Sequence, residues 1–175
     1  MVHPFQHCSA CGSRDLAARS RREFVCTACG YRHFITPIPA ACALVTDSAG
    51  RLLVIRRAHE PGLGKWGLPG GVIEGGETGE EACARELAEE VGLRLPAADF
   101  HYLTSLPNDY LFQGFLWPTI DLFFTAQVAD FRAVLAAPDE VSEWAALALE
   151  EVPLADFAFP SNAQAVWLLQ AGKPF

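Results

Sequence analysis

The sequence predicts an α/β fold, a sheet with helices on both faces, preceded by a small cysteine-rich domain. Three observations predict it. Two Cys-x-x-Cys-Gly motifs stand near the N-terminus, strand-like and helix-like segments are mixed along the rest of the chain, and one helix between them has clear start and stop signals. At 175 residues, with 51% hydrophobic and 19% charged residues, the chain suits one globular domain with a small appendage.

The cysteines predict a structural zinc site. Cys8 and Cys11 form the first motif, Cys26 and Cys29 form the second, and a glycine follows each motif. Four thiolates can close a tetrahedral zinc site that has no open position. Two disulfides are the alternative, which a reducing compartment disfavours. We expect a cytoplasmic protein, because the first residues lack a basic stretch followed by an apolar one. Residues 1–36 are therefore assigned to a zinc ribbon.

Within the ribbon we expect short antiparallel strands and a turn near residues 13–18. Residues 36–39 contain two prolines, which disfavour both helix and central strand, and they indicate a linker. Residues 40–46 are apolar and predict a buried strand. A turn at residues 47–50 then leads to a hairpin partner over residues 51–57.

A loop over residues 59–71 leads to the best-marked element, a helix over residues 78–91. Thr78 and Glu81 form a capping box at its start, and Gly92 is a typical C-terminal stop. Its apolar residues fall on one face, opposite a set of glutamates that we expect to face solvent. These apolar residues are Ala84, Leu87, Ala88 and Val91.

Beyond this helix the sequence predicts further strands and one more helix. Residues 107–118, between two prolines, are expected to form a long connection. Residues 161–170 predict a C-terminal helix that Ser161 caps. The further strands are expected over residues 100–106, 119–129 and 141–147.

Three glutamates on the first helix indicate a site for a divalent cation. Glu86, Glu89 and Glu90 stand at i, i+3 and i+4, so they share one helix face. Like charges at this spacing cost about 0.2–0.5 kcal/mol per pair, and a hard cation such as Mg²⁺ removes the repulsion. The glycine-rich stretch before the helix, which ends at Gly71, permits close approach by a phosphate or a cation.

The segment from Gly71 to Leu93 resembles the Nudix box. The fixed positions that match are Gly71, Glu77, Arg85-Glu86-Leu87, Glu89-Glu90 and Gly92-Leu93. A looser resemblance extends from about Pro39 to Leu149. The resemblance implies a Nudix α/β/α sandwich with a mixed sheet over residues 37–175. It also implies a hydrolase that uses Mg²⁺ or Mn²⁺ to cleave a nucleoside diphosphate linked to another moiety.

The resemblance further implies roles for individual residues. Glu77 would shape the site, and Arg85 would pair with it through two hydrogen bonds. The general base would be Glu89 in the box or Glu140 in a later loop, where a solvated turn is the alternative reading of Glu140. The ligands of the Mg²⁺ or Mn²⁺ would be Glu86, Glu89, Glu90 and the Gly71 carbonyl.

The expected substrate is of ADP-ribose, NADH or FAD type. A zinc ribbon followed by a Nudix box resembles the NADH pyrophosphatase group, and residues 151–161 resemble a group that cleaves FAD and ADP-ribose. Tyr110 and Phe112 are candidates to bind the base, although such aromatic residues also form cores and dimer contacts. The alternatives are a nucleoside triphosphate pyrophosphohydrolase and a nucleotide-sensing or RNA-binding module.

The distribution of charge along the chain restricts the kinds of molecule that it is expected to bind. Residues 1–36 hold five arginines against two acidic residues, whereas residues 37–175 hold eight basic against nineteen acidic residues. Such an acidic body repels polyanions, which disfavours broad nucleic-acid binding, so we expect a small-molecule nucleotide as substrate. The arginines of residues 1–36 are compatible with contact to RNA or a substrate phosphate, and a solvated hairpin is the alternative. No apolar run approaches the ~18–20 residues that span a bilayer, so no membrane association is expected. A homodimer and a monomer are both compatible with the sequence.

Overall fold

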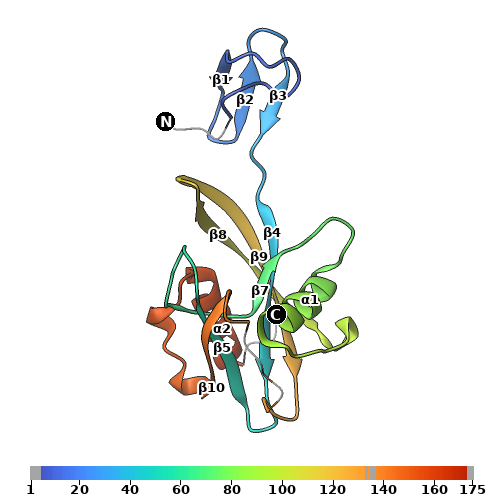
Figure 1. The fold of residues 1–175 in the computed structure, drawn as a ribbon, viewed down its shortest axis with the longest axis vertical. Coiled ribbons are helices and arrows are strands. Elements are labelled where there is room, and N and C mark those ends of the chain that lie inside the picture. Colours follow the sequence, from blue (N-terminus) through green and yellow to red (C-terminus); the bar gives the residue numbers. More distant parts are fainter. Residues whose placement is uncertain (1–4, 133, 135–136, 173–175) are drawn as a thin grey trace. The chain divides into compact units, whose positions relative to one another are not determined.

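The structure, a computed structural model, describes residues 5–132, 134 and 137–172. The chain divides into two compact units (Figure 1). One contains Met1–Ile38 and Asp109–Pro118, and the other contains Pro39–Asn108 and Thr119–Phe175.

The first unit contains a three-stranded antiparallel sheet. The first cysteine motif precedes this sheet, and the second motif begins at the end of its second strand and precedes the third. The sheet consists of β1 (Leu16–Ala18), β2 (Glu23–Cys26) and β3 (Arg32–Phe34), paired in that order. The predicted turn at residues 13–18 is wrong. The first motif itself reverses the chain, because Cys8 N–H donates to Ser13 O at 2.8 Å, and β1 starts three residues later. The turn between β1 and β2 lies at residues 19–22.

The second sheet is mixed. Its strand order is β10 (Val141–Ala148), β5 (Arg51–Arg57), β4 (Ile38–Thr46), β9 (Phe115–Gln127) and β8 (His101–Phe112). The short strands β6 (Trp66–Gly67) and β7 (Gly70–Val72) pair with β5 and β4, so the predicted loop over residues 59–71 contains strand structure. The strands predicted at 40–46, 51–57 and 141–147 are confirmed. They correspond to β4 (Ile38–Thr46), β5 (Arg51–Arg57) and β10 (Val141–Ala148).

Strand β4 begins inside the predicted linker. Pro39 tolerates this position because its carbonyl accepts a hydrogen bond from Ile73 N–H at 3.1 Å, while the first residues of a strand can do without a donor. The linker prediction was therefore wrong for Ile38 and Pro39.

Two long strands replace the predicted connection over residues 107–118. They are β8 (His101–Phe112) and β9 (Phe115–Gln127), neighbours in the sheet. Gln113 and Gly114 have φ values of 50° and 77°, as a two-residue type I′ hairpin turn requires. Pro107 did not end the strand, because β8 is the edge strand, where a missing N–H is tolerated.

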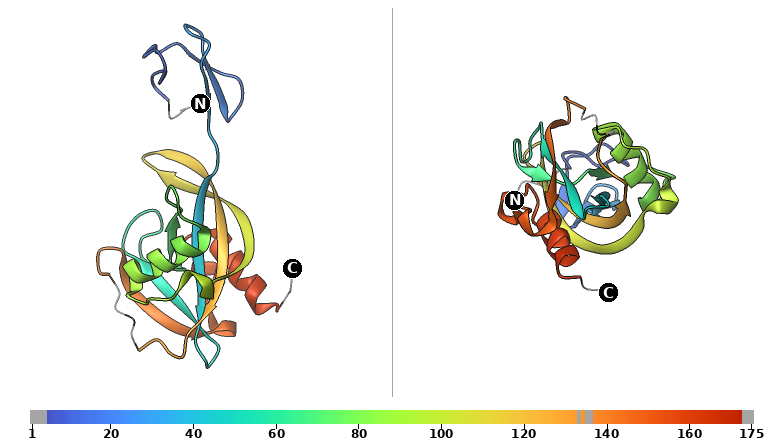
Figure 2. Two further views of the ribbon diagram at one scale, coloured as in Figure 1. Left: turned by 90° about the vertical axis from the view of Figure 1, so that its right-hand side faces the viewer. Right: turned by 90° about the horizontal axis from the view of Figure 1, so that it is seen from below.

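The two α-helices cover opposite faces of the second unit's sheet. Residues of β4 alternate between them: Val45 packs in one core with Leu87 of α1 (Gly79–Val91), and Leu44 packs in the other with Val166 of α2 (Pro160–Gln170). Figure 2 shows the strands between the two helices. This is the predicted α/β/α sandwich. The described residues contain no helix with the length and apolar character needed to cross a membrane.

The N-terminus of α1 has a side-chain cap, whereas that of α2 has none. The predicted start of α1 is confirmed, because Thr78 Oγ1 accepts from Glu81 N–H at 3.2 Å and Glu81 Oε2 accepts from Thr78 N–H at 2.7 Å. Gly92 ends α1 with a φ of 71°. The predicted cap of α2 is wrong: Ser161 lies inside the helix, and its hydroxyl donates to the buried Asp121 carboxylate at 2.6 Å. Short 3₁₀ helices occupy Ala97–Asp99, Leu149–Glu151 and Leu154–Asp156.

Candidate active site

The four motif cysteines lie together in the first unit. Their Sγ atoms all lie within 4.8 Å of one another, with Cys8 to Cys29 at 3.7 Å and Cys11 to Cys26 at 3.6 Å. In a tetrahedral site with Zn–S bonds of about 2.3 Å, sulfur atoms lie about 3.8 Å apart. All four cysteines are free, so the alternative of two disulfides is not adopted. The residues present fit a zinc ion.

The two motifs fold in the same way. Gly12 N–H donates to Cys8 O, and Gly30 N–H donates to Cys26 O, both at 2.8 Å. Both glycines adopt the left-handed backbone conformation, with φ values of 73° and 78°. Glycine adopts this conformation without strain, which explains why a glycine follows each motif. The repeated turn directs both cysteines of each motif toward the other motif.

In the second unit, the predicted acidic cluster lies where α1 packs against β7. The expectation that its glutamates face solvent is wrong for two of them. Glu90 is 8% exposed and the Glu86 side chain 13% exposed, whereas the Glu89 side chain is 57% exposed. Glu90 accepts a hydrogen bond from Gly70 N–H at 3.0 Å, and this contact joins β7 to the end of α1. The buried Glu90 and the partly buried Glu86 therefore line the junction between the glycine-rich strand and the helix.

Two glycines of β7 make this close packing possible. A Cβ atom on Gly71 would lie 2.2 Å from Glu86 Oε1, and one on Gly70 would lie 2.3 Å from Ala41 O. Side chains at these positions would collide with a carboxylate and with β4. The glycines thus permit the backbone to lie directly against the acidic face of α1.

Arg85 joins the parts of the site. Its guanidinium donates to both oxygens of Glu77, at 2.7 and 3.2 Å, as the sequence predicted. It also donates to Glu86 at 2.7 Å and to Glu89 at 3.1 Å. A further bond to Val72 O, at 3.1 Å, connects it to β7. Arg85 therefore fixes the loop before α1, the helix and β7 to one another.

Burial and like charge shift the pKa values of this cluster. Burial, followed by the charges of Glu86 and Glu140, raises the pKa of Glu90 to about 8, against the opposing hydrogen bond from Gly70. Burial also raises the pKa of Glu86, although Arg85 opposes the rise. Hydrogen bonds from Arg85, and then from Glu74 N–H, lower the pKa of Glu77. Burial and like charge thus disfavour the charged forms of Glu86 and Glu90.

The loop that carries Glu140 is tied to the same region. Ala137 N–H donates to Glu90 O at 2.8 Å, and Ala58 N–H donates to Glu140 O at 3.0 Å. The Glu140 side chain is exposed, and its charge contributes to the raised pKa values of Glu86 and Glu90. The structure thus brings Glu140, which is distant in sequence, near the acidic cluster.

These residues suit a hard divalent cation by their chemistry. Carboxylate and carbonyl oxygens are its preferred ligands, and the cluster offers the buried Glu90 and the partly buried Glu86. Of the described residues, only the four cysteines have ligand atoms that all lie within 4.8 Å of one another. Here Arg85 holds Glu86 and Glu89, so the glutamate oxygens have not gathered around one point.

Tyr110 and Phe112 lie on β8 within the segment Asp109–Pro118, which belongs to the first unit. Phe112 is 52% exposed, and Tyr110 is half-buried. Their expected contact with a nucleotide base stays a prediction.

Sequence reasoning missed two polar residues near the site. Arg57, at the end of β5, lowers the pKa of Glu90 by its charge and lies over the Phe159 ring at 5.1 Å. Asn162, in the first turn of α2, accepts a hydrogen bond from Leu68 N–H at 3.1 Å. No neighbouring residue marks Asn162, because its partner lies 94 positions earlier in the chain.

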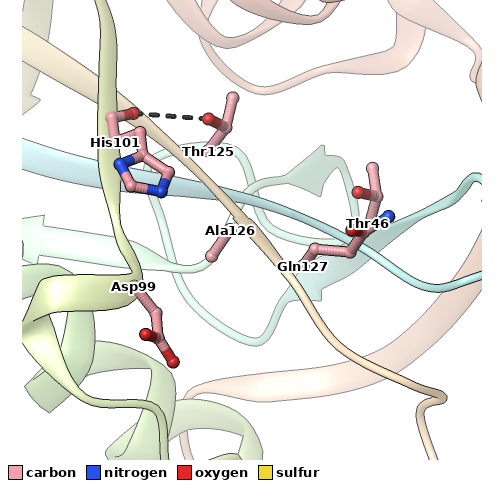
Figure 3. Close-up of a pocket in the computed structure, with 6 residues that line it drawn as sticks. All are labelled: Thr46, Asp99, His101, Thr125, Ala126 and Gln127. Carbon is pink, nitrogen blue, oxygen red and sulfur yellow. Dashed lines mark hydrogen bonds between the residues drawn. The ribbon is translucent and has the colours of Figure 1, made fainter.

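A separate pocket of about 440 Å³ lies at the other end of β4 (Figure 3). Thr46, which lines it, is four residues beyond the last β4 residue that pairs with β7. None of the predicted site residues lines this pocket. Its lining residues are Thr46, Asp99, His101, Thr125, Ala126 and Gln127.

Known proteins resemble this chain in sequence and in fold. An NAD-capped RNA hydrolase, NudC, of Stutzerimonas stutzeri is 31% identical over 144 residues, which are 81% of this chain and 48% of the relative. An ADP-ribose pyrophosphatase of Methanocaldococcus jannaschii is 41% identical over 63 residues, 36% of this chain and 37% of the relative. The chain thus spans about half, or less, of the length of these relatives.

Among solved structures, a NUDIX hydrolase from Nitrosomonas europaea has the same fold. Its TM-score is 0.70 at 22% identity, with 97% of this chain and 95% of that chain covered. Residues 36–168 match the NUDIX domain family, a span that includes the acidic cluster, the glycine-rich strand, α1 and most of α2. The chain belongs to the Nudix family.

Proposed function

We propose that this chain is a Mg²⁺- or Mn²⁺-dependent pyrophosphohydrolase that cleaves a nucleoside diphosphate linked to another moiety, of ADP-ribose, NADH or FAD type. The observation that carries the proposal is a pair of carboxylates, the buried Glu90 and the partly buried Glu86, packed against two glycines that leave backbone next to them. A divalent cation would stabilise the charged forms of these carboxylates, which burial disfavours.

In this proposal the ligands are the Glu86, Glu89 and Glu90 carboxylates and the Gly71 carbonyl. When bound, the cation neutralises diphosphate oxygens and lowers the pKa of a water molecule. The ion pair of Arg85 and Glu77 holds the loop before α1 against the helix, so the ligands stay oriented toward β7. Attack by water on one phosphorus would release a nucleoside monophosphate and the phosphorylated second moiety.

Two carboxylates are candidates for the general base that accepts a proton from the attacking water. Glu89 lies in the cluster, and its side chain is 57% exposed, so a water molecule can reach it. Glu140 is exposed beside the cluster on a loop anchored to Glu90 O. Substituting each by Gln separates them, because loss of the base lowers kcat and removes one limb of the pH–rate profile.

We assign zinc to the cysteine cluster as a structural ion of the ribbon, residues 1–36. Four thiolates leave no open position for a reacting molecule, so the ion would stabilise the fold of this unit and take no part in hydrolysis.

The relatives support the substrate class. One is named for ADP-ribose and another for NAD-capped RNA, and both names include an adenosine diphosphate linked to a second moiety. The test is a panel of ADP-ribose, NADH, FAD, a diadenosine polyphosphate and nucleoside triphosphates with Mg²⁺ or Mn²⁺. AMP and ribose 5-phosphate from ADP-ribose support the proposal. Pyrophosphate released from triphosphates, with no cleavage of the linked diphosphates, would favour the triphosphate alternative.

RNA that carries a nucleotide at its 5′ end is a second candidate substrate. Arg19, Arg21 and Arg22 cluster at the turn between β1 and β2, and they form no ion pair within residues 5–132, 134 and 137–172. Tyr31 and Phe34 of the same unit are 49% and 57% exposed, and exposed aromatic rings beside arginines suit single-stranded RNA. The test is binding of a short RNA by the full chain at several salt concentrations. Salt-dependent binding that is lost when the three arginines are changed to Ser would support this substrate. Binding that is unchanged in this variant would exclude RNA binding by the ribbon.

A further inference from the structure

The segment that precedes the acidic cluster is held from three sides. Pro69 O accepts from Ala43 N–H of β4 at 2.8 Å. Gly70 N–H donates to Glu90 of α1 at 3.0 Å. Leu68 N–H donates to Asn162 of α2 at 3.1 Å. Leu68 and Gly70 are two residues apart, so the contact with α2 and the contact with a predicted metal ligand act on one short length of backbone.

Asn162 is built into the core at this point. It is 3% exposed, so its side chain lies inside the fold. Leu68 is 5% exposed, so its N–H has no access to water that could replace Asn162. The contact joins residues 94 positions apart in the chain. A neighbouring pair supports the same joint, since Ala158 N–H donates to Trp66 O at 2.8 Å.

From these contacts we infer that Asn162 is a positioning residue for the metal site: it fixes Leu68 N–H, and through Leu68–Gly71 it holds Glu90 and the Gly71 carbonyl in place. The inference rests on the proposed function only for the effect on turnover. Its effect on metal affinity and on backbone order can be measured without substrate.

Ser161 provides a matched control in the same turn of α2. Its hydroxyl donates to Asp121 at 2.6 Å, and both residues are buried. Ser161→Ala therefore removes one buried hydrogen bond from the same helix turn without removing a contact to the Leu68–Gly71 segment. A general loss of stability would affect both variants, whereas a positioning effect would appear in Asn162→Leu.

The experiment compares the full-length protein, Asn162→Leu and Ser161→Ala at a temperature where all are folded by circular dichroism. Mn²⁺ binding without substrate is followed by electron paramagnetic resonance, and amide hydrogen exchange is followed at Leu68 and Gly70. We expect Asn162→Leu to bind Mn²⁺ about tenfold more weakly and to exchange faster at Leu68, because a buried N–H is left unpaired. Ser161→Ala should change Mn²⁺ binding by less than about twofold.

A second measurement does not depend on how the variants fold. Coupling is reciprocal, so Mn²⁺ added to the unchanged protein should slow exchange at the Leu68 amide. Equal Mn²⁺ affinities for the two variants, or no change at Leu68 on adding Mn²⁺, would overturn the inference. If the unchanged protein binds Mn²⁺ but hydrolyses nothing in the substrate panel, the proposed function fails while a weakened Asn162→Leu still supports the inference.

Discussion

Arg85 and Glu77, which are eight positions apart in the sequence, form a bidentate ion pair. Arg85 Nη2 lies 2.7 Å from one Glu77 carboxylate oxygen, and Nε lies 3.2 Å from the other. The pair joins the loop before α1 to the face of the helix that carries Glu86, Glu89 and Glu90. The same guanidinium also contacts Glu86 and Glu89, so its geometry affects how the acidic residues are held.

Replacing Arg85 by Lys keeps the charge and removes the planar fork. We expect kcat/KM to fall about tenfold or more, because Lys cannot bond both oxygens of Glu77 and reach Glu86 at once. Steady-state hydrolysis of ADP-ribose measures the change. The control is Arg94→Lys, at an exposed position after the helix, and equal activity of the two variants would contradict the role of the fork.

Replacing Gly71 by Ala should damage activity more than stability. The new Cβ would lie 2.2 Å from Glu86 Oε1, at the flexible end of a side chain, so the carboxylate can move aside and the fold survives. Misplacing a ligand by about 1 Å can cost about 100-fold in rate. Gly75→Ala, which meets no atom within 4 Å, is the control. A Gly71→Ala protein with normal turnover would show that this close approach is not needed.

The raised pKa of Glu90 predicts two opposite pH effects. Its ordinary value is 4.5 and its value in the fold is about 8. Without metal, the unfolded chain loses this proton at lower pH than the folded chain. Its contribution to the free energy of unfolding is therefore full below about pH 4.5 and is lost as the pH rises through about 8. Metal binding needs the carboxylate, so Mn²⁺ affinity should rise from pH 6 to pH 9.

These effects are measured by thermal unfolding of the metal-free protein and by Mn²⁺ titration at several pH values. Metal-free unfolding should occur at lower temperature at pH 9 than at pH 6, and Glu90→Gln should reduce that difference. A Mn²⁺ affinity that does not depend on pH between 6 and 9 would argue against Glu90 as a ligand.

Glu90→Gln should also abolish turnover while the fold and the zinc content remain. The amide has nearly the same shape and can still accept from Gly70 N–H, but it lacks the charge that a cation needs. Hydrolysis, circular dichroism and metal analysis test the three parts. Glu80→Gln, in the first turn of the same helix, is the control, and substantial turnover by Glu90→Gln would remove Glu90 from the site.

The cysteine cluster should hold about one zinc ion per chain. Cys26→Ser should lose that ion, because the change removes one of the four thiolates that form the cluster. Cys83→Ala changes a buried cysteine outside the cluster and should keep the zinc. Elemental analysis of the purified proteins measures both, and a zinc-free unchanged protein with four titratable thiols in the cluster would contradict the assignment.

Local signals in the sequence were sufficient where structure follows from neighbouring residues. The capping box of Thr78 and Glu81, the stop at Gly92 and the spacing of the cysteine motifs each appear in the fold as predicted. The prediction failed where distant parts decide. Glu90 is buried because β7 packs over it, and Ser161 bonds Asp121 instead of capping α2.

The hairpin of β8 and β9 shows a different kind of failure. Prolines suggested breaks, whereas the turn is made by Gln113 and Gly114, a pair less marked than Asn-Gly. The contact of Asn162 with Leu68 N–H had no local sign, since it joins the start of α2 to a segment 94 positions earlier.

The most direct test is anomalous diffraction from a crystal of the full chain soaked with Mn²⁺ and a non-hydrolysable ADP-ribose analogue. The predicted result is a manganese peak about 2.0–2.2 Å from oxygens of Glu86, Glu90 and the Gly71 carbonyl, with Arg85 still bound to Glu77. A map with no peak at this position, and with Glu86 and Glu89 still bonded to Arg85, would contradict the account.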